Sequence, residues 1–80
     1  MTIEIGKKFS VSEIVTPAIV ASTFGSGALP VFATPYLIAL MEHAAFACLQ
    51  ELLDEGQGSV GTHLNVSHES PTPIGMTVRA

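Results

Sequence analysis

Three side chains in this sequence could carry chemistry together: a carboxylate, a hydroxyl and an imidazole. Glu42 lies in a run of good helix formers, residues 34–53. At about 100° per residue it shares one broad face with apolar side chains: Ile38, Ala45, Phe46, Leu49 and Leu53. Burying an unpaired carboxylate is costly, so Glu42 must be exposed, paired or used. An apolar wall suits a carboxylate that acts as a general base or a nucleophile.

Thr34 and His68 are the other two candidates. Thr34 precedes Pro35 at the start of the helical run, so its side chain is expected to cap the helix. The same helix start gathers unpaired N–H groups, which could hold a carbonyl oxygen as charge develops on it. Thr34 and Glu42 are separated by about 12 Å of helix rise, so they need a shared pocket or a partner chain to act together. His68 is expected to be either a hydrogen-bonded core or rim histidine or a proton-transfer group.

Other residues that often carry chemistry give weaker signals. The three histidines match no metal-binding spacing such as HExxH, so neither a metal nor another cofactor is expected. The single cysteine, Cys48, excludes an internal disulfide and a multi-cysteine zinc site, and it is expected in the core. Gly61 lies in an extended run, where glycine marks either a bulge or a close backbone approach to a ligand.

The elements that must position these residues follow in the order strand, long helix, strand, strand. This order predicts an α+β fold in which an antiparallel sheet packs on one helix. Alternation of apolar and polar residues predicts strands at residues 2–5, 9–15, 59–68 and 74–78. The helix is expected over 34–53 with Gly56 as its stop, and residues 18–24 are compatible with either a short helix or a strand.

The size of the chain predicts a partner. Eighty residues form one small domain, and such a chain buries only about 60% of its unfolded surface. Because 48% of the residues are apolar, part of this surface is expected to be covered, most simply by a second copy. The β-like run at 76–80 has no closing turn, which predicts that further strands belong to the fold.

Charge and hydropathy exclude several classes of function. The net charge is −4, and Lys7, Lys8 and Arg79 are the only basic residues, which argues against nucleic-acid binding. No signal peptide and no uninterrupted membrane-spanning stretch is recognisable. A cytoplasmic protein without a membrane partner is therefore expected.

An ordered set of short motifs resembles a known superfamily. The motifs are Val31–Pro35, Leu40–Glu42, Ser59–Thr62, Val66–His68 and Thr72–Met76. At these intervals the sequence resembles the hot-dog thioesterases, and within them the branch related to fluoroacetyl-CoA thioesterase, over residues 8–80. The resemblance implies an antiparallel sheet wrapped around one long central helix, with active sites at the subunit interface of a homodimer or a dimer of dimers. Residues 1–80 would then form a single hot-dog domain that lacks the later strands.

The resemblance also implies a reaction, the hydrolysis of an acyl-CoA thioester. Glu42 matches the catalytic carboxylate, Thr34 the hydroxyl at the helix start, and His68 the histidine on the following strand. Glu42 would attack the carbonyl or activate water, while His68 assists proton transfer and Thr34 orients Glu42 or the substrate. The implied substrate-binding positions are Gly61, Thr62 and Phe32. Gly61 is the backbone position that helps to hold the thioester oxygen.

One departure from the family pattern bears on the substrate. The fluoroacetyl enzyme has a bulky aromatic lid before the helix, whereas residues 21–27 contain a single aromatic, Phe24. Specificity for fluoroacetyl-CoA is therefore not carried over, and a general small acyl-CoA thioesterase is expected. Two other functions remain open on the same fold: an acyl-CoA binding module without hydrolysis, and a structural fragment whose apolar surface drives assembly.

Overall fold

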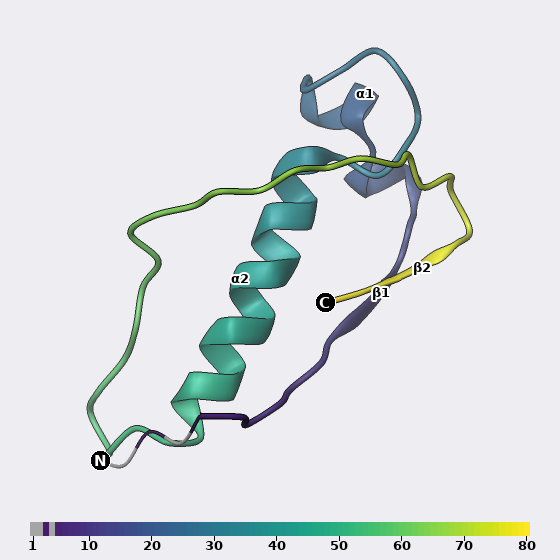
Figure 1. The fold of residues 1–80 in the computed structure, drawn as a ribbon. Coiled ribbons are helices and arrows are strands. Elements are labelled where there is room, and N and C mark those ends of the chain that lie inside the picture. Colours follow the sequence, from purple (N-terminus) through teal and green to yellow (C-terminus); the bar gives the residue numbers. More distant parts are fainter. Residues whose placement is uncertain (1–2, 4) are drawn as a thin grey trace.

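One long helix, α2 (Thr34–Gln50), runs through the molecule, and the other segments pass around it (Figure 1). The computed structural model describes residue 3 and residues 5–80. Before α2 come β1 (Ser12–Ile14), the 3-10 turn η1 (Pro17–Ile19) and α1 (Ala21–Phe24); after it comes β2 (Thr77–Arg79). Residues 18–24 are thus mainly helical. Residues 2 and 4 of the strand expected at 2–5 lie outside the described residues, and Ile3 and Ile5 are not in a strand.

The two strands form an antiparallel pair that joins distant parts of the chain. Ser12 lies opposite Arg79, and Ile14 lies opposite Thr77. Beyond the strands, Val15 N–H donates to the Met76 carbonyl over 2.8 Å. The strand expected at 9–15 is therefore confirmed over its second half. The strand expected at 74–78 begins later, because residues 74–75 form a turn with Gly75 at φ 95°, a conformation that glycine adopts readily.

The hydrophobic core lies between α2 and the segment that follows β1. Its buried members are Val15, Ile19, Val20, Phe32 and Leu40, with Tyr36 and Leu37 packed against them. The helix therefore buries the face that carries Leu37, Leu40 and Ala44. The face that carries Glu42, Ala45 and Phe46 is exposed in this chain. Both faces of α2 are apolar, so residue spacing alone did not decide which one the sheet covers.

Backbone hydrogen bonds to two other segments of the chain hold the residues just before α2. Phe32 N–H donates to the Thr72 carbonyl over 2.8 Å, and Ala33 N–H donates to the Ile19 carbonyl over 3.0 Å. Ala33 occupies the N-cap position without a side-chain cap, and Thr34 is the first helical residue. The expectation that Thr34 caps the helix is therefore wrong: its hydroxyl makes another contact, described below.

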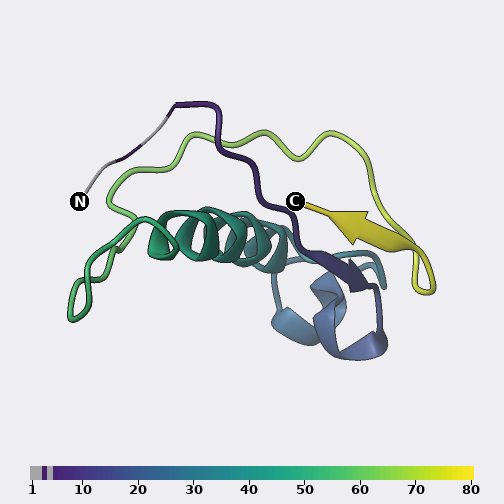
Figure 2. The ribbon, with the colours of Figure 1, turned by 90° about the horizontal axis from the view of Figure 1, so that it is seen from below.

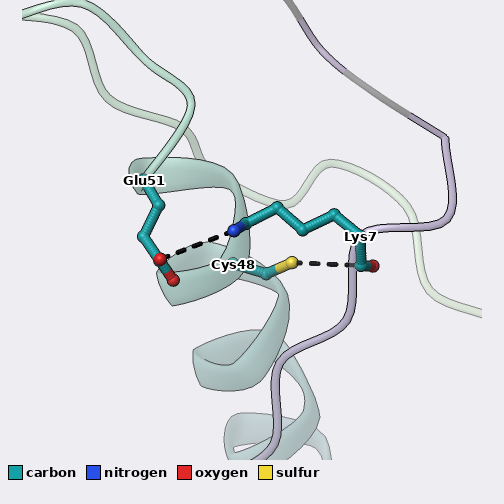
Figure 3. A network of polar contacts seen from close by, with 3 residues as sticks. All are labelled: Lys7, Cys48 and Glu51. Atoms are coloured by element: carbon teal, nitrogen blue, oxygen red, sulfur yellow. Dashed lines mark hydrogen bonds and ion pairs between the residues drawn. The ribbon is translucent and has the colours of Figure 1, made fainter.

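The far end of α2 is covered by the N-terminal segment. The helix ends at Gln50, three residues before the expected end, and a turn follows in which Gly56 has φ 84°. Lys7 Nζ lies 3.4 Å from Glu51 Oε1, and the Cys48 thiol donates to the Lys7 carbonyl over 4.0 Å (Figure 3). Cys48 is thus half-buried under the N-terminal segment and is not part of the main core.

Residues 58–71, which we call the extended segment, run from the C-terminal end of α2 to its start (Figures 1 and 2). The strand expected at 59–68 lies here. Within the described part of the chain, this segment makes no backbone hydrogen bond with another residue. Its large apolar side chains are exposed to solvent: Val60 is 89% exposed and Leu64 is 52% exposed. The segment is extended, as expected, but has no strand partner among the described residues.

Candidate active site

The extended segment brings His68 onto the start of α2. Thr34 Oγ1 lies 2.7 Å from His68 Nδ1, a hydrogen bond in which the tautomer of the imidazole decides which atom donates. The backbone bond between Phe32 and Thr72 holds the two segments together next to this pair. The hydroxyl and the imidazole that sequence reasoning selected separately are therefore in direct contact.

The same segment brings Gly61 onto Glu42. A Cβ atom added to Gly61 would lie 2.6 Å from Glu42 Oε2 and 3.7 Å from Glu42 Cδ. Gly61 is not among the residues with positive φ, so backbone conformation does not require glycine here; a side chain at this position would displace the carboxylate of Glu42. The sequence left open a bulge or a close backbone approach to a ligand at Gly61. The group that lies close in the structure is the carboxylate of Glu42, and an approach to a ligand stays a prediction.

Glu42 is exposed in this chain, and within the described residues it forms no ion pair. The burial among apolar side chains that its sequence neighbours suggested is therefore not present here. Glu42 lines an apolar groove of about 590 Å³ between α2 and residues 59–61. The apolar part of the helix wall consists of Ala39, Ala45, Phe46 and Leu49, and Val60 comes from the extended segment. The predicted apolar face of the helix is thus the wall of a groove that adjoins the candidate catalytic carboxylate.

The two remaining predicted substrate positions differ in their surroundings. Phe32 is only 1% exposed, and its ring packs edge-on against Tyr36 with centroids 5.7 Å apart. Its side chain is therefore not available for direct contact with a substrate, and it holds the helix start in place. Thr62 is exposed and follows Gly61 in the extended segment; a substrate contact at Thr62 stays a prediction.

Sequence reasoning missed His43 and the pair formed by Tyr36 and Glu13. His43 lines the groove next to Glu42, and its position beside that residue in the sequence was the available signal. Tyr36 Oη donates to Glu13 Oε1 over 2.6 Å, joining β1 to the first turn of α2. This hydrogen bond, followed by burial and by the charge of Glu13, raises the pKa of Tyr36 above its usual value. No spacing rule connects two residues so far apart in sequence.

Among the described residues, no group of three or more histidine, cysteine, aspartate or glutamate side chains is placed to hold a metal ion. None of the helices in the described part of the chain is long and apolar enough to cross a membrane.

The chain is similar to a family of thioesterases. The family model described as fluoroacetyl-CoA-specific thioesterase matches residues 15–80. A fluoroacetyl-CoA thioesterase from Streptantibioticus cattleyicolor is 44% identical over 48 residues, which cover 60% of this chain and 34% of that protein.

Solved structures of the fluoroacetyl-CoA thioesterase FlK share the fold. One has a TM-score of 0.87 at 30% identity, covering 99% of this chain and 63% of that one. A variant in complex with fluoroacetate and CoA has a TM-score of 0.86 at 31% identity, covering 96% of this chain and 66% of that one. The expected α+β hot-dog fold is thereby confirmed for the part that this chain spans, which is less than two thirds of each of these relatives.

Proposed function

This chain belongs to the fluoroacetyl-CoA-specific thioesterase family, and we propose on that basis that it hydrolyses a small acyl-CoA thioester. Glu42, His68 and Thr34 are the proposed catalytic residues. The observation that carries the proposal is that one extended segment places His68 on Thr34 and Gly61 on Glu42. The pair of Thr34 and His68 lies at the start of α2, and Glu42 lies about 12 Å of helix rise further along it. The proposal therefore requires a pocket, completed by a partner chain, that presents one substrate to both.

The proposed reaction begins at Glu42. Its carboxylate either takes a proton from water, which adds to the thioester carbonyl, or itself adds to the carbonyl and is released by water later. The C–S bond then breaks, and His68, in its imidazolium form, gives a proton to the departing CoA sulfur. The proton released by the attacking water returns to the imidazole. The products are the free acid and CoA. The Thr34 hydroxyl holds the imidazole through Nδ1, so that its other nitrogen is the one available for this transfer.

Gly61 supports this chemistry in two ways. With no side chain, it lets the carboxylate of Glu42 lie against the backbone of the extended segment. The family resemblance adds that the backbone of Gly61 helps to hold the thioester oxygen, where an N–H group would stabilise the developing negative charge. The carboxylate and the oxyanion site would then share one short stretch of backbone.

We also propose that the enzyme works as a homodimer or a dimer of dimers. The support is the open surface: the face of α2 that carries Glu42 is exposed, and the extended segment has unpaired backbone in the described residues. A second copy that covers these features would seclude the site from water. A cytoplasmic location stays a prediction from the sequence.

The test of the proposed function is acyl-CoA hydrolysis, followed as release of the free CoA thiol. Glu42→Gln removes the base or nucleophile and keeps the size of the side chain, and we expect kcat to fall by about 10²–10⁴-fold. Glu55→Gln, in the exposed turn after α2, is the matched control and should leave kcat unchanged. Binding of CoA esters without turnover by the unmodified protein would favour the acyl-CoA binding module instead.

A further inference from the structure

Most of the apolar groove lies on the side of Glu42 that faces away from the other two candidate catalytic residues. Thr34 and His68 lie at the start of α2, whereas the helix wall of the groove runs from Ala39 past Glu42 to Leu49, near the C-terminal end of α2. Seven residues of helix separate Glu42 from Leu49, which corresponds to a rise of about 10 Å. An acyl-CoA has its acyl chain on one side of the carbonyl and CoA on the other. If the carbonyl lies at Glu42, one of these two parts can therefore lie along the groove.

The charges of the groove favour the acyl chain over CoA as its occupant. Its lining includes no lysine or arginine, and its one carboxylate is Glu42. The phosphates of CoA would be repelled there and would find no cation, because Lys7, Lys8 and Arg79, the three basic residues of the chain, all lie outside it. A neutral hydrocarbon acyl chain is the occupant that complements this lining.

We propose that this groove is the acyl-chain subsite, and that it takes acyl groups of roughly six to eight carbons, whose extended length is comparable to the helix rise of about 10 Å from Glu42 to Leu49. The acyl chain lies against Phe46 and Leu49 on the helix, with Val60 on the other wall. Phe46 is 45% exposed and Val60 is 89% exposed, so a hydrocarbon chain has apolar surface to cover at both. This inference rests on the proposed hydrolysis and deepens it, since it replaces a generic small acyl group with a medium-length one.

The experiment is a chain-length series with acetyl-, butyryl-, hexanoyl-, octanoyl- and dodecanoyl-CoA. For each methylene buried in the groove, kcat/KM should rise by about three- to fourfold, up to eight carbons, and then stop rising. Hydrolysis of acetyl-CoA with no rise along the series would overturn the subsite and leave the proposed function intact.

Two substitutions of Leu49 test whether the far end of the groove causes the preference for longer acyl chains. Leu49→Ser removes apolar surface at the far end of the groove, and Leu49→Trp fills that end. Each should lower the octanoyl-to-acetyl ratio of kcat/KM by about tenfold, the equivalent of two lost methylene contacts. Leu53→Ser, at a half-buried leucine that does not line the groove, should leave this ratio unchanged. Equal ratios in all of these proteins would contradict the proposal.

Two further outcomes separate this proposal from its alternatives. If no thioester is hydrolysed, the proposed function fails, and calorimetric binding then decides on the subsite. Octanoyl-CoA that binds at least tenfold more tightly than acetyl-CoA, with Leu49→Ser removing the difference, supports the subsite; equal affinities overturn it. If Leu49→Ser weakens self-association in sedimentation but leaves the octanoyl-to-acetyl ratio intact, side chains of a second copy fill the groove in place of an acyl chain, and the proposal is wrong.

Discussion

The hydroxyl oxygen of Thr34 lies 2.7 Å from Nδ1 of His68, a short hydrogen bond between the first residue of α2 and the extended segment. The local structure around each residue does not by itself produce this contact. The contact depends on the backbone bond from Phe32 to Thr72, which brings the two segments together. The predictions below concern this pair, the neighbouring carboxylate and the contacts that hold the helix.

The first prediction concerns the hydroxyl of Thr34. Thr34→Val keeps the shape of the side chain but removes the hydrogen bond to His68, and we expect kcat for acyl-CoA hydrolysis to fall by about tenfold. Thr34→Ser keeps the hydroxyl and should stay within about threefold of the unmodified enzyme. Both are measured by steady-state kinetics, and equal rates for the valine and serine variants would contradict the role given to the hydroxyl.

The second prediction concerns the space at Gly61. In Gly61→Ala the new Cβ would meet Glu42 Oε2 at 2.6 Å, so the carboxylate must move, and we expect kcat to fall by at least about tenfold. The fold should be little affected, because Gly61 is exposed and does not need a positive φ.

Gly58→Ala is the control for this substitution. Gly58 lies in the same segment, it also lacks a positive φ, and nothing lies within 4 Å of the added Cβ. Its kinetics should match those of the unmodified protein, and thermal unfolding should show both variants folded. Full activity in Gly61→Ala would refute the close approach of the carboxylate.

The third prediction concerns Tyr36 and pH. Tyr36→Phe keeps the ring contacts and removes the hydrogen bond to Glu13, which should cost about 1–2 kcal/mol in the free energy of unfolding at pH 7. The raised pKa means that the folded state favours the protonated phenol. This stabilisation is complete below the usual tyrosine pKa of 10.0 and is lost as pH rises through the higher folded-state value.

Urea unfolding of the unmodified protein and of Tyr36→Phe checks this prediction. The difference between the two should be constant up to about pH 9.5 and should shrink above pH 10. Glu13→Gln keeps an acceptor for the phenol but removes the charge, so it should cost less than Tyr36→Phe. A difference that grows at high pH would have the wrong sign for this pair.

The fourth prediction concerns the exposed ion pair between Lys7 and Glu51, which we expect to contribute little to stability. Lys7 and Glu51 form an ion pair at 3.4 Å, with their side chains 28% and 51% exposed, so solvent screens the attraction (Figure 3). Lys7→Met should lower the free energy of unfolding by less than about 0.5 kcal/mol, and 0.5 M salt should remove that difference. A loss of 2 kcal/mol or more in chemical denaturation would show that the pair is not a surface ion pair.

The fifth prediction concerns assembly. If a second copy covers the extended segment, amide hydrogen exchange at residues 59–68 should be slow at high protein concentration. Dilution below the dissociation constant of the dimer should then make exchange fast there, while the amides inside α2 keep their protection. Exchange that is fast at every concentration would exclude strand pairing between copies at this segment.

Sequence reasoning placed the helix well and its buried face poorly. The helical run, the apolar residues around Glu42 and the extended character of residues 59–68 all follow from local periodicity. The burial of Leu40 and Ala44 could not be deduced in the same way, because α2 is apolar on two faces and only tertiary packing selects one.

The contacts of the candidate site depend on chain topology more than on local pattern. The N-cap expectation for Thr34 followed a sound local rule, yet a residue far along the chain supplies the partner of its hydroxyl. Glu42 and Gly61 were each singled out from the sequence, but their contact was not expected. Motif resemblance placed Thr34, Glu42 and His68 in one site because a family pattern carries three-dimensional information that spacing alone does not contain.

The pairing of β1 with β2 has a consequence for how the site forms during folding. Ile14 meets Thr77, so this one ladder closes a loop that contains α2 and the extended segment. Closing so long a loop has a large entropic cost, and contacts of this kind form slowly, whereas a single helix forms in about a microsecond. We therefore expect α2, with Glu42 on it, to form before the ladder. The proposed catalytic carboxylate would then lie on an early element, inside a loop that the pairing of β1 with β2 closes later.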